Sequence, residues 1–139
     1  MVIGGKSSET GRFLSTVSSH DLPTNTWLVN LPQLNYSRAY AASCLITGYV
    51  YVFAGTGYNR LELDSIEKIC SSSLASNAPA SWALIVVPPD ILRPRFSPAV
   101  ASLNDYEIVI MGGHDGVNNL CDVVLFDTRT NTCQNVVRN

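Results

Sequence analysis

One octet of the sequence occurs twice, and this repetition limits the possible folds more than any other feature. "HDLPTNTW" at positions 20–27 returns as "FDTRTNTC" at positions 126–133, so the pattern Asp-x-x-Thr-Asn-Thr is written twice. The copies stand too far apart for one local turn, and between them lies room for one more unit of about half that interval. Self-similarity at a fixed period is the signature of a repeat architecture.

Four other features recur in the same order. Apolar runs ending in small residues stand at 1–5, 51–55 and 109–113, and their last glycines lie 50 and 58 residues apart. Each run is followed by a segment that opens with Leu and has Val or Ile at its fourth position, at 14–21, 63–70 and 120–127. The other two features are Trp27 and Trp82, with Cys133 in the third place, and an arginine that opens a strand, Arg38 and Arg95. Together these features define three units.

The units are expected to consist of β-strands. Runs such as "GYVYVFAG" and "DYEIVIMGG" combine strand-prone residues with Gly, Asp and Asn at their ends. The Asp, Asn and Thr of the two octets are typical of turns closed by side-chain hydrogen bonds, and the middle unit has "CSSSLASNAPASW" instead. A helix over 64–76 is the competing interpretation for one segment, but its alignment with "DVVLF" favours a strand.

The ordered set resembles the kelch repeat. The residues that carry the resemblance are Gly4-Gly5, Asp21, Thr24-Asn25-Thr26-Trp27, Gly55, Trp82, Gly112-Gly113, Phe126-Asp127 and Thr130-Asn131-Thr132. By resemblance, each unit is a four-stranded antiparallel blade of a β-propeller. Trp27 and Trp82 would then pack between blades, and Asp21 and Asp127 would cap turns.

The resemblance implies an all-β, kelch-type β-propeller segment with about three blades and eleven strands, divided as 1–37 (partial, without its opening strand), 38–94 and 95–139. Propellers usually close with about four to eight blades, so this is an incomplete ring with two open flanks. Either the chain is part of a longer propeller, or two copies join as a homodimer that closes a six-bladed ring.

Charge and composition exclude several classes of partner. The net charge is only −2 and the basic residues form no run, which gives no case for nucleic acid or a membrane surface. No apolar stretch approaches the roughly 18 residues of a membrane span, and no secretory signal opens the sequence. The four cysteines could form two disulfides but are expected to be reduced thiols, and His20 and His114 have no zinc-ligand spacing with them. By resemblance, a cytoplasmic protein is expected.

The predicted function is non-catalytic protein–protein interaction through a loop face, as in kelch adaptors and scaffolds. By resemblance, that face comprises residues 6–12, 56–62 and 114–119 together with the connectors 30–37 and 87–95. The residues there best able to contact a peptide or protein partner, including an acidic one, are Arg60, Tyr58, Arg38, Arg93, Arg95 and His114. Arg38 and Arg95 have an alternative role, bracing the backbone of a blade.

A fragment of a kelch-like propeller enzyme, of the oxidase or sugar epimerase type, is the alternative. No Tyr, His and Cys set for copper can be assembled, and no catalytic motif or phosphate loop is present. His114-Asp115 could act as a general base with its orienting carboxylate, but "HDG" is also an ordinary turn sequence. No catalytic residue, metal site or cofactor is therefore predicted.

Overall fold

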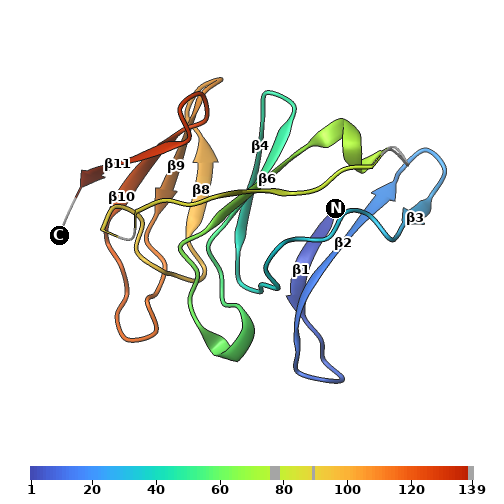
Figure 1. Cartoon of the computed structure of the whole chain (residues 1–139), viewed down its shortest axis with the longest axis horizontal. Helices are drawn as coiled ribbons and strands as arrows, with labels where there is room; N and C mark the ends of the chain where they lie inside the picture. The colour runs from blue at the N-terminus through green and yellow to red at the C-terminus, as the bar shows by residue number, and fades with distance from the viewer. Residues whose placement is uncertain (76–78, 89, 138–139) are drawn as a thin grey trace.

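The computed structural model describes residues 1–75, 79–88 and 90–137, with Val137 placed by its backbone alone. Within these ranges the chain forms eleven strands in three antiparallel sheets (Figure 1). Sheet 1 contains β1 (Val2–Lys6), β2 (Phe13–Asp21) and β3 (Thr26–Leu28). Sheet 2 contains β4 (Ala42–Ile46), β5 (Tyr49–Phe53), β6 (Ile66–Cys70) and β7 (Ala83–Ile85). Sheet 3 contains β8 (Ala99–Ser102), β9 (Glu107–Met111), β10 (Val123–Asp127) and β11 (Thr132–Val137).

The all-β prediction and its three, four and four strands are confirmed within the described residues. In each sheet the strands pair in chain order, and each sheet lies within one of the predicted units. The segment with two interpretations forms β6, as the alignment predicted, and then the 3-10 helix η2 (Ser71–Leu74). Residues 76–78 of the Ser/Ala-rich segment after β6 lie outside the described residues.

The repeated octets form equivalent turns, β2–β3 and β10–β11. Asn25 and Asn131 have φ of 53° and 55°, in the left-handed region that Asn adopts more readily than most residues. Asp127 Oδ1 accepts a hydrogen bond from the Arg129 amide at 2.8 Å, and Asp21 accepts one from the Thr24 hydroxyl, as the capping prediction requires. Threonine hydroxyls pair across both turns, Thr24 with Thr26 at 2.8 Å and Thr130 with Thr132 at 2.7 Å.

In sheets 1 and 2, the glycine that ends the apolar run links its sheet to the next one. The amide of Gly5 donates to the carbonyl oxygen of Arg38 at 2.8 Å, and the amide of Gly55 donates to that of Arg95 at 2.8 Å. Gly55 has φ of +97°, and a Cβ there would stand 2.7 Å from the Ala39 carbonyl oxygen, so glycine is required. The residue before it, Ala54, has φ of 57°. Alanine is tolerated at this left-handed position, which explains why the middle unit has Ala-Gly in place of Gly-Gly.

Two hydrophobic cores fill the spaces between consecutive sheets. Between sheets 1 and 2 lie Val17, Leu34, Val50, Val52, Ile69, Leu74 and Trp82. The larger core, between sheets 2 and 3, includes Tyr51, Phe53, Ile66, Ile108, Ile110, Phe126 and Cys133. Successive residues of a strand point to opposite faces, which is why β5 supplies Val50 and Val52 to one core and Tyr51 and Phe53 to the other.

The two tryptophans occupy different environments. Trp82 is 3% exposed between sheets 1 and 2, and its Nε1 donates to the Pro32 carbonyl oxygen at 2.9 Å, so the prediction for Trp82 is confirmed. Trp27 is 55% exposed and contacts the ring of His20 at 5.0 Å between centroids. The predicted packing of Trp27 between blades is wrong for this structure, because within the described residues no sheet covers that side of sheet 1.

Candidate functional site

The predicted loop face exists as one edge of the molecule. The segments 6–12, 56–62 and 114–119 follow β1, β5 and β9 and lie side by side along the lower edge of Figure 1. The connectors 30–37 and 87–95 lead into β4 and β8 from that same edge (Figure 1), although residue 89 lies outside the described residues. The turns β2–β3, β4–β5 and β10–β11 lie at the opposite edge.

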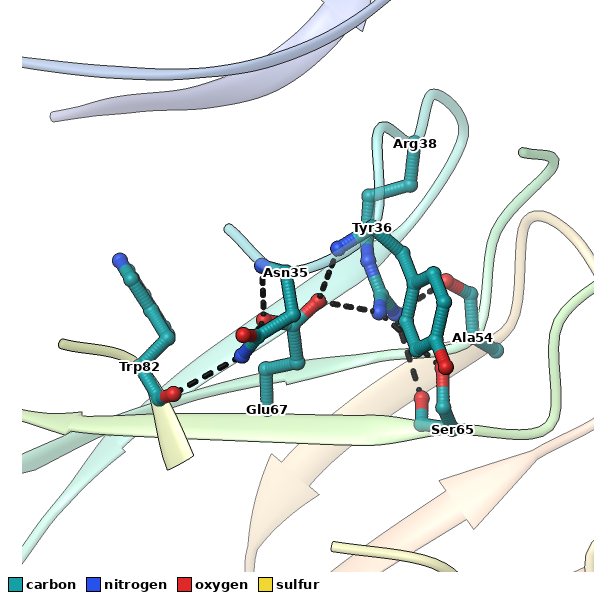
Figure 2. Close-up of polar contacts among 7 residues, drawn as sticks. All are labelled: Asn35, Tyr36, Arg38, Ala54, Ser65, Glu67 and Trp82. Atoms are coloured by element: carbon teal, nitrogen blue, oxygen red, sulfur yellow. Dashed lines mark hydrogen bonds and ion pairs between the residues drawn. The ribbon is translucent and has the colours of Figure 1, made fainter. Parts of the chain in front are cut away.

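Arg38 is buried within sheet 2 and does not reach the loop surface. Its side chain is 0% exposed, and Nη2 forms an ion pair of 2.6 Å with Oε1 of Glu67, which is also 0% exposed (Figure 2). Nη1 donates to the carbonyl oxygens of Ala54 at 2.8 Å and Ser65 at 3.2 Å. Burial lowers the pKa of Arg38 from its usual value, and the carboxylate of Glu67 opposes that change.

Glu67 extends this network to the preceding connector. Its carboxylate accepts the Asn35 amide at 2.6 Å, the Asn35 side-chain amide at 2.9 Å and the Tyr36 amide at 3.1 Å. The same Asn35 side chain donates to the Trp82 carbonyl oxygen at 2.8 Å, as Figure 2 shows. The connector between sheets 1 and 2 is thereby fixed to β6, so it is a braced segment of the loop face.

Arg95 repeats the arrangement in sheet 3. Its guanidinium is 0% exposed and makes two hydrogen bonds of 2.8 Å to the two oxygens of Asp122, a bidentate pair. It also donates to the Gly112 carbonyl oxygen at 2.9 Å and to the Arg93 carbonyl oxygen at 3.0 Å. Hydrogen bonding from Arg95 is the main cause that lowers the pKa of Asp122.

These contacts correct the prediction of Arg38 and Arg95 as partner-binding residues. Both side chains are fully buried, and both use their guanidinium groups on the carboxylate and backbone of their own blade. Of the two roles considered, bracing is the one that the geometry supports. Arg93 does reach the surface, with 48% of its side chain exposed and Nη2 3.8 Å from Asp122 Oδ2.

Tyr58 and Arg60 lie at the surface, as predicted. They belong to the 3-10 helix η1 (Tyr58–Arg60), and Asn59 and Arg60 have φ of 60° and 59°, which turns the segment sharply. An amide-to-carbonyl hydrogen bond of 2.8 Å from Gly57 to Leu61 closes the base of this loop. Tyr58 is 78% exposed, so its ring contributes little to the core and is available to a partner.

A groove of about 550 Å³ brings these two residues beside the first loop. Its lining consists of Gly11, Arg12 and Phe13 from one side and Tyr58, Asn59 and Arg60 from the other. The sequence placed Arg12 in the loop face but did not single it out, and Phe13 was missed. Phe13 directly follows the predicted loop, which is the signal that could have found it. Arg93 and His114 are not among the lining residues.

His114 and Asp115 serve their own loop. His114 Nδ1 accepts the Gly116 amide at 2.9 Å, and the imidazole contacts the ring of Phe96 at 5.1 Å between centroids. Asp115 Oδ1 accepts the amides of Val117 at 2.9 Å and Asn118 at 2.7 Å, and these hydrogen bonds lower its pKa. The pair therefore caps a turn, the ordinary interpretation of "HDG".

Neither a metal site nor a membrane-spanning helix is found in the described ranges. No three His, Cys, Asp or Glu side chains there gather closely enough to hold a metal ion. No helix within those ranges has the length and apolarity to cross a membrane. All four cysteines are free in this structure, and burial raises the pKa of Cys133 to about 12.

Comparison with known proteins identifies the segment of the chain that contains sheet 3. Residues 95–138 match the family model of the Kelch motif. This segment is a kelch repeat. It spans Arg95, the Gly112-Gly113 pair and the Asp127 turn. The buried arginine–carboxylate pair recurs in sheet 2 and the Asp turn in sheet 1. The three open antiparallel sheets are consistent with blades of a partial kelch propeller. A search of curated proteins found no match to the chain.

Proposed function

We propose that this chain is a non-catalytic interaction module that holds an acidic peptide segment of a protein partner in the groove between loops 6–12 and 56–62. The single observation that carries the proposal is the juxtaposition of Arg12, Arg60 and Tyr58 around a groove of about 550 Å³. Two guanidinium groups offer forked donors for carboxylates, and the tyrosine ring adds flat contact area with a polar tip.

The charge distribution around the groove supports an acidic ligand. Arg12 and Arg60 are both exposed and have no carboxylate partner in the described part of the chain, in contrast to the paired Arg38 and Arg95. Lys6 adds a third positive charge beside the groove, with Nζ 6.0 Å from the centroid of the Phe13 ring. Glu62 lies on the far side of its loop, beside Gly116 of the next loop. The residues that line the groove include two arginines and no acidic side chain, so a carboxylate placed there would meet positive charge.

The rigidity of the scaffold also favours binding. Buried arginine networks brace sheets 2 and 3, and the connector to sheet 2 is held by Glu67. A loop face fixed in this way loses little conformational freedom when it binds, which is the advantage of a preorganised site. Arginines able to bind carboxylates with two hydrogen bonds, placed along a groove, favour binding of an extended peptide segment.

Selection of a displayed peptide library against the 139-residue chain would test the proposal. Peptides selected from a random-sequence library should be enriched in Asp and Glu, and their affinity should fall as salt concentration rises. Arg12→Ala, Arg60→Ala and Tyr58→Ala should each weaken a selected peptide by about tenfold or more, as expected for a contact worth at least about 1.4 kcal/mol.

Arg129→Ala is the matched control, because Arg129 is 59% exposed but lies in the β10–β11 turn at the opposite edge. The control should leave peptide affinity unchanged. Selected peptides without acidic enrichment, or acidic peptides that bind the three groove variants as tightly as the unmodified chain, would contradict the proposal.

A further inference from the structure

Every junction between sheets uses the same two faces. We define the near face of a sheet as the one turned to the preceding sheet and the far face as the one turned to the following sheet. In sheet 2, the near face includes Ile69 and Trp82, and the far face includes Tyr51, Phe53 and Ile66. In sheet 3, Phe126 and Cys133 belong to the near face and pack against the far face of sheet 2.

The near face of sheet 1 lies open. Trp27 of β3 pairs with His20 of β2, and its position in sheet 1 is equivalent to that of Trp82 in sheet 2. Val2 pairs with Ser18 on the same face of sheet 1. Val17 alternates with these residues and packs into the core on the opposite face. Trp27 is 55% exposed and Val2 is 53% exposed, although Trp82 at the equivalent position is buried.

The far face of sheet 3 is also open, and it is apolar except at one end, where Glu107 pairs with Asp127. Two rows of side chains cross three of its strands: Ala99, Met111 and Val123 in one, Ala101, Val109 and Leu125 in the other. The matching row in sheet 2, Ala42 with Phe53 and Ile66, is covered by sheet 3. Met111 is 39% exposed where its counterpart Phe53 is 0% exposed. An uncovered apolar sheet face marks an interaction surface.

We infer that these two faces bind each other between two copies of the chain. The far face of sheet 3 in one copy receives the near face of sheet 1 in the other, so the contact continues the junctions already made inside each copy. Two copies contribute six sheets, within the roughly four to eight blades of closed propellers, whereas three copies would exceed that range. The dimer has a twofold axis and two identical junctions, each between different faces.

The contact area suffices for a stable dimer. With about five residues per strand, the four strands of sheet 3 cover roughly 320 Å² and the three strands of sheet 1 roughly 240 Å², from a strand spacing of about 4.8 Å and a rise of about 3.3 Å per residue. Two faces of sheet 3 and two of sheet 1 then amount to roughly 1,100 Å², which exceeds the roughly 1,000 Å² that a biological interface should clear. A single junction would reach only half of that bound, so closure of both junctions is what stabilises the pair.

Native mass and variants of both faces test the inference. The full chain of 15.1 kDa should elute with twice that mass in light scattering on a sizing column. Met111→Lys and Trp27→Ser should each give a monomer, because each alters one side of both junctions. Val117→Lys is the control, since Val117 is 81% exposed in the loop 114–119 and belongs to neither face. That control should remain a dimer.

Mixing the two variants separates this arrangement from others. The Met111→Lys copy keeps an intact near face and the Trp27→Ser copy an intact far face, so the mixture recovers one junction and should dimerise at higher concentration than the unmodified chain. A dimer that loses its mass with Met111→Lys but not with Trp27→Ser would show contact between two copies of sheet 3 and would overturn the inference. The inference would also be overturned if the unmodified chain were monomeric at every soluble concentration, or if it formed open polymers.

Discussion

Replacing Asp122 with alanine should destabilise the fold more than most substitutions of a polar residue. Asp122 is 3% exposed and accepts two hydrogen bonds of 2.8 Å from Arg95, whose side chain is 0% exposed. Its removal leaves a buried guanidinium without its counter-charge, which typically costs 3–5 kcal/mol. Arg95 keeps its bonds to the carbonyl oxygens of Gly112 and Arg93, so we expect the lower end, about 3 kcal/mol.

Urea unfolding followed by circular dichroism measures this loss. With a slope of roughly 1–3 kcal/mol per molar urea for a small protein, the midpoint should fall by at least about 1 M. Arg129→Ala removes an exposed ion pair while Asp127 keeps its backbone hydrogen bond, so it should shift the midpoint far less. Comparable shifts for the two variants would refute the reasoning.

A second substitution tests the cause. If the penalty comes from the unpaired charge, Arg95→Met in the Asp122→Ala background should recover stability, because no buried charge remains. The double variant should therefore be more stable than Asp122→Ala alone, a non-additive result expected of residues in direct contact. If the loss of stability in the double variant equals the sum of the losses in Asp122→Ala and Arg95→Met, the contribution of Arg95 to stability does not depend on Asp122.

Three further predictions concern acid, thiols and a turn. The pKa of Asp122 lies below its usual 3.8, so the stabilisation from its carboxylate is present at neutral pH and is lost as pH falls below about 4. Below about pH 4, the difference in urea midpoint between the unmodified chain and Asp122→Asn should therefore become smaller. Iodoacetamide should modify exposed Cys121 in the folded chain but reach Cys133 only after unfolding, as peptide mass spectrometry would show. Gly55→Ala should cost about 2 kcal/mol or more in thermal unfolding, whereas Gly48→Ala, with φ of +78° and open space around its Cβ, should cost about 1 kcal/mol.

Recurrent features of the sequence were sufficient to predict the strands and turns. The Asp and Asn of the octets act locally, because a turn is closed by residues only a few positions apart, and both turns have the predicted caps. The strand at Ile66–Cys70 was also predicted, by alignment with a β-branched segment of the next unit. The 3-10 helix after it was not, since its composition carries no strong signal.

The site was harder to predict because it depends on contacts between units. The sequence pattern of a strand-opening arginine is the same whether its guanidinium faces solvent or a distant carboxylate. Arg95 pairs with Asp122, 27 residues away, and Arg38 pairs with Glu67, 29 residues away. The groove likewise depends on how sheet 1 meets sheet 2, which places Arg12 opposite Arg60. Only the packing of the sheets distinguishes an arginine that braces a blade from one that is exposed to solvent.

Amide exchange at the last glycine of each apolar run reports whether its sheet is bonded to a following sheet. Gly5 and Gly55 donate to the carbonyl oxygens of Arg38 and Arg95, but the amide of Gly113 meets no acceptor in the part of the chain described here. In a ring of two copies it stays without one, since sheet 1 has no counterpart of β4 to offer that carbonyl. Hydrogen–deuterium exchange should thus be slow at Gly5 and Gly55 and fast at Gly113. Slow exchange at Gly113 would reveal a different neighbour, a chain that brings its own opening strand.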